Sequence, residues 1–153
     1  MNPLIISPQP AACDEALVAL QVVLDQSLLQ YVSEARLWVD AAHAGATKTL
    51  KRLAEGQRES ASDLADLLAS RRLLPELATF RSEYAQWHYL ALAYLIERVV
   101  ADQQRVVAVA QEAVSACAAT GSATSLEAIM KREVGHLDEL RRLGELLRGS
   151  QTE

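Results

Sequence analysis

The chain has 153 residues, half of them apolar, and its 15 basic and 20 acidic residues give a net charge of −5. That length suits one domain with a full hydrophobic core, and the scarcity of aromatic and β-branched runs favours helices. The acidic balance and the lack of a basic patch argue against nucleic-acid binding. No stretch has the run of about 18 to 20 apolar residues that spans a membrane, so we expect no membrane partner.

The two cysteines, Cys13 and Cys117, are too few for a disulfide framework. The segment before Cys13 has no basic start and no long apolar run, so it does not match a signal peptide. We therefore expect a reduced, cytoplasmic protein in which Cys117, at core spacing, is a small buried apolar residue.

Apolar residues recur at steps of three and four along most of the chain, which is typical of amphipathic helices. Residues 1–12 contain three of the prolines and predict a flexible arm. A first helix is expected over residues 13–43, where Gly45 ends it, and a second over residues 47–71.

Residues 72–86 contain Pro75 and lack clear periodicity, which predicts a connection. A third helix is expected over residues 87–119 and a fourth over residues 125–148, and residues 149–153 are expected to be a disordered tail. Residues 13–148 would then form a four-helix bundle.

The connection over residues 72–86 is long compared with the links on either side. The second helix spans about 37 Å at about 1.5 Å per residue, and about 15 extended residues can reach about 50 Å. The connection can therefore run back along the whole bundle, which predicts that the second and third helices are parallel. We expect an all-α four-helix bundle with a long crossover.

Polar residues interrupt the apolar stripe of every predicted helix. Glu133 and His136 lie three residues apart on the fourth helix and so share its core-facing side. The first helix contributes Glu34 and the third contributes Asp102. A buried carboxylate needs compensation, and carboxylate with imidazole suits iron and other divalent metals. The pattern therefore predicts a metal site made of Glu34, Asp102, Glu133 and His136, and the alternative is a hydrogen-bonded layer of Glu, Gln, Asp, Ser and His side chains without a metal.

The stretch from Leu126 to Leu140, with its Glu-x-x-His turn, closely resembles the fourth helix of the ferritin-like carboxylate superfamily, which includes bacterioferritins and rubrerythrins. The stretch 28–31 resembles part of the first helix of that family. The resemblance implies a ferritin-like fold and a di-iron site made from a Glu on the first and third helices and Glu-x-x-His on the second and fourth. On the second helix this chain has Gln57 and Ser60 in place of the family's Glu and His. The resemblance therefore implies an incomplete site that holds at most one metal ion.

We expect a ferritin-like protein that binds iron or another divalent metal at this incomplete site and forms a homodimer through an exposed helix face. One alternative is a metal-free structural or protein-interaction bundle that has lost the ancestral di-iron site. Another is a peroxide- or oxygen-handling enzyme with a complete site assembled across a dimer, against which Gln57 and Ser60 argue. The sequence indicates no catalytic residue and no small-molecule substrate, and it leaves open whether Gln57, Ser60 or His88 joins the site.

Overall fold

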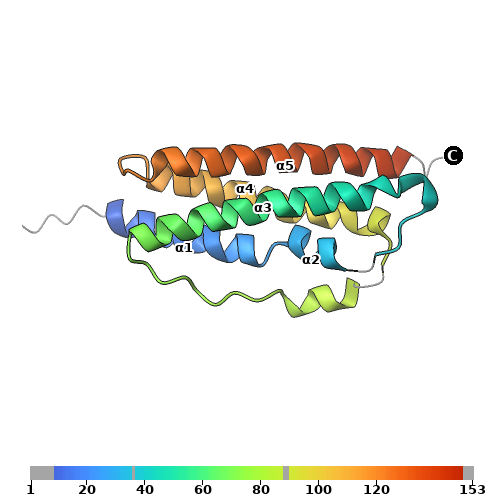
Figure 1. Ribbon diagram of the computed structural model, residues 1–153, viewed down its shortest axis with the longest axis horizontal. Coiled ribbons are helices and arrows are strands. Elements are labelled where there is room, and N and C mark those ends of the chain that lie inside the picture. The colour runs from blue at the N-terminus through green and yellow to red at the C-terminus, as the bar shows by residue number, and fades with distance from the viewer. Residues whose placement is uncertain (1–8, 36, 88–89, 150–153) are drawn as a thin grey trace, which may run out of the picture.

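The computed structural model describes residues 9–35, 37–87 and 90–149, and this part of the chain is all-helical, as predicted. Its helices are α1 (Gln9–Asp25), α2 (Leu28–Glu34), α3 (Gly45–Ser70), α4 (Leu92–Ala116) and α5 (Ala123–Gly149), with the short 3₁₀ helices η1 (Ala41–His43) and η2 (Ser82–Trp87). Figure 1 shows the long helices lying lengthwise beside one another. Each of them buries one face, as the spacing of its apolar residues requires.

Contacts at both ends of the molecule fix the directions of the helices. The Arg71 guanidinium, just past the end of α3, donates to Asp14 near the start of α1. At the start of α1, Cys13 contacts Cys117 at the end of α4. Helices α3 and α4 therefore both run against α1 and point the same way, while α5 returns along α4 (Figure 1).

The segment between α3 and α4 runs back along α1 and α2 (Figure 1). The Gln21 side chain on α1 pairs with the backbone of Glu76, donating to its oxygen and accepting from its nitrogen, each at 2.9 Å. Further along, the rings of Phe80 and Tyr84 lie 5.3 and 5.4 Å from the ring of Tyr31 on α2. The segment is therefore attached to the first helices over most of its length.

The prediction of one continuous helix over residues 13–43 was wrong, because the chain breaks between α1 and α2. The Leu28 N–H, which would bond to the Leu24 oxygen in a continuous helix, donates instead to Asp102 on α4 at 2.9 Å. Neither glycine nor proline marks the break, so the cause is a tertiary hydrogen bond. Beyond α2 the chain leaves the helical conformation until η1, whose His43 N–H is capped by Asp40.

Other boundaries differ by a few residues from those expected. Helix α1 begins at Gln9, inside the predicted arm, and α3 includes Gly45, which was expected to separate two helices. Helix α4 begins at Leu92, because Trp38 pairs with the backbone of residues 90 and 92 and holds the intervening backbone extended. Helix α5 includes Gly149. Residues 1–8 of the predicted arm and 150–153 of the predicted tail lie outside the described residues.

The buried apolar side chains form two clusters, one toward each end of the helices. One cluster gathers around α2 and the start of α4, and includes Leu29, Leu53 and Leu95. The other gathers around α1 and the end of α4, and includes Leu17 and Leu64. Along α3, α4 and α5 the buried residues between the clusters are mostly polar, and these polar residues form the candidate site.

Cys13 and Cys117 form a disulfide that joins positions 104 residues apart in the sequence. The expectation of reduced cysteines, with Cys117 an isolated buried apolar residue, was wrong. Both residues are fully buried within the same apolar cluster. The antiparallel packing of α1 and α4 brings them together, and the sequence spacing alone does not reveal that packing.

Among the described residues, the stretch Ala11–Glu34 is long and apolar enough to cross a membrane by length and composition. Half of its most apolar window is buried against the other helices. Core helices and signal sequences share this composition, so the stretch is weak evidence for a membrane segment.

We predict that replacing both cysteines, Cys13→Ser with Cys117→Ser, lowers the free energy of unfolding by about 2 to 5 kcal/mol, because a crosslink that closes a loop of this length restricts the unfolded chain. Urea denaturation with and without a thiol reductant measures the change. Reduced wild-type protein should unfold like the double variant. Two reactive thiols in unfolded, unreduced wild type would contradict the disulfide.

Candidate functional site

Glu133 and His136, two of the predicted ligands, both point into the core from α5. The Glu133 side chain is fully buried and His136 is 8% exposed. The Nδ1 atom of His136 lies 3.1 Å from Oε2 of Glu133, which is within ion-pair distance, although the alignment falls short of a hydrogen bond. The two groups therefore interact electrostatically at the centre of the molecule.

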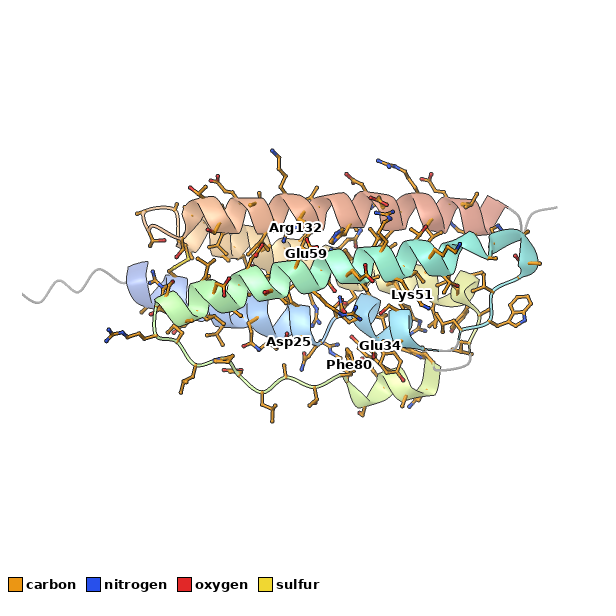
Figure 2. All side chains as sticks on the ribbon, viewed as in Figure 1. Asp25, Glu34, Lys51, Glu59, Phe80 and Arg132 are labelled. Carbon is orange, nitrogen blue, oxygen red and sulfur yellow. A yellow bond between two sulfur atoms is a disulfide. The ribbon has the colours of Figure 1, made fainter. Side chains whose placement is uncertain are left out.

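Glu34, the ligand predicted on the first helix, lies on the surface. Its side chain is 70% exposed and pairs with Arg58 at 3.3 Å. Figure 2 shows Glu34 at α2, away from Arg132, the sequence neighbour of Glu133. The break before α2 resets the helical phase, so the residues of α2 that face the core are Leu28, Leu29, Gln30, Val32 and Ser33.

Asp102, the ligand predicted on the third helix, binds the start of α2. Its carboxylate accepts from the Leu28 N–H at 2.9 Å and from Arg105 at 3.3 Å. Burial raises the pKa of Asp102 above its ordinary value, and the hydrogen bond from Leu28 and the charge of Arg105 partly oppose that shift. Asp102 therefore acts as a capping group for a neighbouring helix.

Gln103 takes the core position on α4 that the prediction gave to Asp102. The predicted stripe repeated every 3.5 residues, whereas a straight α-helix has 3.6 residues per turn and drifts by about 20° per heptad. The buried positions accordingly shift by one residue in mid-helix, to Val99, Gln103, Val106 and Ala110. Gln103 is fully buried.

The Glu133 carboxylate accepts hydrogen bonds from side chains on two other helices. Its Oε1 accepts from the Gln57 amide at 2.9 Å and from the Gln103 amide at 3.1 Å. Its Oε2 accepts from the Ser60 hydroxyl at 2.7 Å. The same hydroxyl accepts from Arg132 at 3.1 Å, which links the buried carboxylate to a cation nearer the surface.

Three glutamine amides extend this arrangement to α2. Gln30 donates to the Ala54 oxygen at 2.8 Å and to Gln57 at 3.0 Å. Gln57 donates onward to Gln103 at 3.0 Å, besides its bond to Glu133. Gln103 in turn donates to the Glu133 backbone oxygen at 3.0 Å. We call Gln30, Gln57, Ser60, Gln103, Glu133 and His136 the core polar network.

The hydrogen bonds of the network keep Glu133 ionised. Burial is the largest single influence and raises the pKa of Glu133, but the electrostatic interaction with His136 and the hydrogen bonds from the amides of Gln57 and Gln103 together outweigh it. The pKa of Glu133 is therefore lowered from its ordinary value of 4.5. The network supplies the compensation that a buried carboxylate requires.

Gly56 on α3 provides the space that His136 occupies. A Cβ atom at Gly56 would lie 2.6 Å from Nε2 and 3.0 Å from Cε1 of the imidazole. Real Cβ contacts are essentially never this short, so a side chain at position 56 would displace the ring. The imidazole is thus held between the α3 backbone on one side and the Glu133 carboxylate on the other.

The donor set around Glu133 does not fit a divalent metal held by the four predicted ligands. The structure brings Glu133 and His136 together, but Glu34 and Asp102 are engaged elsewhere. Amide N–H groups and a hydroxyl occupy the carboxylate oxygens that a metal would need. Within the described residues, no group of three or more His, Cys, Asp or Glu side chains is placed to hold a metal ion. His88, the further candidate, lies outside the described residues.

The sequence interpretation missed Gln30 and Gln103 as members of the network. Gln103 could have been found by following a 3.6-residue repeat along α4. Gln30 could not, because its core position depends on the break between α1 and α2. Gln57 and Ser60, whose participation was open, both contact Glu133.

Comparisons with known proteins add no family to this picture. No protein-family model matches the chain, and no match was found among curated proteins or solved structures.

We predict that Glu133→Gln lowers the free energy of unfolding by about 3 kcal/mol near neutral pH, because the donors of the network lose a charged acceptor. The folded-state pKa of Glu133 lies below 4.5, so the stability from its ionisation is present above that pH and is lost as the pH falls through the folded-state value. The deficit of the variant should therefore shrink in acid. Urea denaturation over a pH series measures it, and a deficit that stays constant into acid would contradict this role.

Substitution by alanine should change the free energy of unfolding in opposite directions at two glycines that lie within helices. Gly56→Ala should destabilise by about 1 to 3 kcal/mol, because the new methyl group collides with His136. At Gly144 the nearest atom to an added Cβ is Ile96 Cγ1 at 3.6 Å, so Gly144→Ala should stabilise by up to about 1 kcal/mol through helix propensity. Chemical denaturation compares the pair. Combining Gly56→Ala with His136→Ala should remove the collision, and an undiminished penalty would show another cause.

Proposed function

We propose that the chain is a ferritin-like four-helix bundle whose metal-binding layer has been replaced by hydrogen-bond donors, and that it works as a metal-independent structural or protein-interaction domain. The fold part of the proposal is supported by the common direction of α3 and α4 and by the long segment that connects them along α1 and α2. The Glu133 and His136 side chains of the Glu-x-x-His turn are both buried on α5, as the resemblance to that family implies.

The observation that carries the proposal is the complete engagement of the Glu133 carboxylate. Gln57 and Gln103 donate to one oxygen and Ser60 to the other, while His136 lies beside them. These donors come from two other helices, α3 and α4, and provide locally what a cation would otherwise provide. A core stabilised in this way needs no ion to fold.

Binding of one divalent metal per chain, iron among the candidates, is a second possibility that one observation favours. His136 Nδ1 is buried, and its geometry toward Glu133 falls short of a hydrogen bond, so this nitrogen has an unused bonding capacity. An ion at Glu133 and His136 would have to displace the Ser60 hydroxyl from Oε2. This requirement makes metal binding the weaker of the two candidates.

We also propose that the domain folds where thiols are oxidised, in place of the cytoplasm expected from the sequence. The support is the buried disulfide between Cys13 and Cys117, because disulfides of this structural kind persist mainly in oxidising compartments. The free-thiol measurement described for the cysteine pair tests this proposal too. The homodimer expected from the sequence stays a prediction.

We predict that iron(II), manganese(II) or zinc(II) leaves the melting temperature of chelator-treated wild type unchanged, because a ligand that does not bind the folded state cannot stabilise it. Thermal melts with and without each metal, on wild type and His136→Ala, measure the effect. A metal-dependent rise in melting temperature that His136→Ala abolishes would overturn the proposal and establish the second candidate. A rise that survives the substitution would place a metal site elsewhere in the chain and would equally overturn metal independence.

A further inference from the structure

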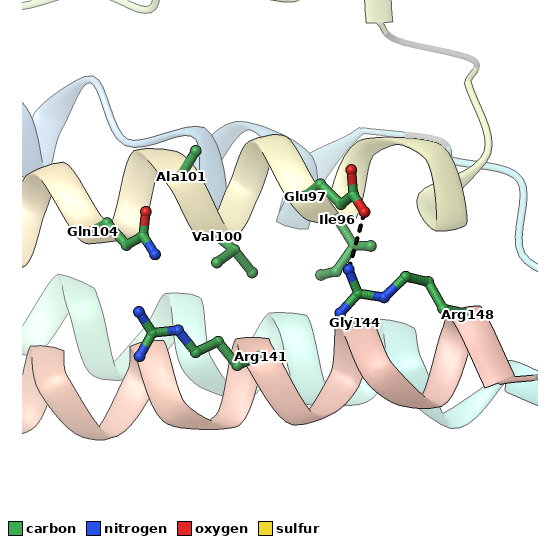
Figure 3. A pocket seen from close by; sticks show the side chains of 8 residues that line it. All are labelled: Ile96, Glu97, Val100, Ala101, Gln104, Arg141, Gly144 and Arg148. Carbon is green, nitrogen blue, oxygen red and sulfur yellow. Dashed lines mark hydrogen bonds and ion pairs between the residues drawn. The ribbon is translucent and has the colours of Figure 1, made fainter.

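A groove of about 290 Å³ lies between α4 and α5, apart from the core polar network. Figure 3 shows the side chains that line it, which reach across from both helices. Its lining residues are Ile96, Glu97, Val100, Ala101, Gln104, Arg141, Gly144 and Arg148. The groove thus combines an apolar floor with cationic and amide groups at its edges.

The floor of the groove depends on Gly144. This glycine is buried, and a Cβ placed there would contact Ile96 at 3.6 Å and Arg148 Nη2 at 3.8 Å. Ile96 is fully buried beneath the groove, so the half-buried side chain of Val100 supplies its accessible apolar surface (Figure 3). An apolar body can therefore lie against Val100 and be removed from water.

The two arginines that edge the groove differ in their electrostatic state. Arg148 is paired with Glu97 at 2.9 Å, so its charge is compensated. Arg141 projects over the groove toward the Gln104 amide (Figure 3). Within the described part of the chain Arg141 forms no hydrogen bond or ion pair, so the groove has one uncompensated positive charge.

We propose that this groove binds a monocarboxylate with a short apolar body. The Arg141 guanidinium offers a planar pair of N–H donors that matches a carboxylate, and the Gln104 amide can donate beside it. The body lies along Val100, above the buried Ile96. Arg141 and Arg148 are separated by two helical turns, about 10 Å, which is the length available to a short aliphatic chain.

Charge complementarity sets the number of acidic groups that the ligand carries. A second carboxylate at the other end of the groove would meet Glu97, which already holds Arg148 and would repel it. An inorganic anion would satisfy Arg141 but leave the apolar floor exposed to water. The combination favours one carboxylate with an apolar body over either a diacid or a bare ion.

The test titrates octanoate, below the concentration at which it forms micelles, into the full-length chain by isothermal calorimetry and by amide chemical-shift mapping. We expect saturable binding with shifts on α4 and α5 around the groove. Acetate, which lacks the apolar body, and octylamine, which carries the opposite charge, should each bind at least about tenfold more weakly, since each loses one of the two recognition elements.

The matched variants are Arg141→Gln and Arg142→Gln, which remove the same charge from adjacent positions of α5. Arg142 is exposed and does not line the groove, so it controls for the loss of net charge. Arg141→Gln should weaken octanoate binding by about tenfold or more, while Arg142→Gln should change it by less than about twofold. Equal affinity of wild type and Arg141→Gln, equal affinity for acetate and octanoate, shifts that map elsewhere or no binding at all would overturn the proposal. None of these outcomes bears on the metal independence of the core.

Discussion

A carboxylate at the centre of a helical core has to be surrounded by donors, because leaving it unpaired costs several kcal/mol. Glu133 imposes that requirement on its neighbours, and Gln57, Ser60 and Gln103 meet it from α3 and α4. Successive residues of an α-helix are rotated by about 100°, so a shift of one residue in α3 would carry both Gln57 and Ser60 away from Glu133. The network therefore fixes the register in which the helices pack, which apolar contacts alone would define more loosely.

The level of the network also organises the rest of the chain. The apolar clusters lie on either side of it, and the break between α1 and α2 occurs at the same level. At that break Asp102 binds the free N–H of Leu28, one residue from Gln103 of the network. Two adjacent residues of α4 thus stabilise different elements. Asp102 stabilises the start of α2, and Gln103 stabilises the Glu133 carboxylate of α5.

Sequence periodicity was sufficient to predict the all-helical character of the described residues, the approximate extents of α3, α4 and α5, and the inward direction of Glu133 and His136. It failed where a distant partner decides the local structure. Leu28 leaves the helical hydrogen-bond pattern for Asp102, and this bond moves Glu34 to the surface and Gln30 into the core. The pattern of residue types within one segment of the sequence does not reveal which distant residue that segment will bind.

The arrangement around Glu133 differs from the predicted one for a related reason: Glu34 and Asp102 lie apart from it, and Gln103 lies beside it. Carboxylate and imidazole side chains are readily recognised as candidate metal ligands in a sequence. A glutamine gives no such signal, because most glutamines are ordinary surface residues. In the structure the glutamines are as important to the core polar network as Glu133. An amide can donate and accept hydrogen bonds at once, so each glutamine connects one helix to the next. The pairing of Cys13 with Cys117 was equally hidden, since it follows from the antiparallel packing of α1 on α4.

The disulfide crosslinks only one of the two apolar clusters, so the two ends of the molecule should differ in local stability. It lies within the cluster built around α1, whereas the cluster around α2 contains no crosslink within the described residues and is joined to the irregular backbone near η1 and η2. Segments that differ in this way open as separate cooperative units with different free energies. We expect the polar layer to be the boundary between those units, because there the hydrogen bonds of Glu133 join α3, α4 and α5. Amide hydrogen exchange would therefore be graded along the length of each long helix, with slow exchange on the crosslinked side of position 133.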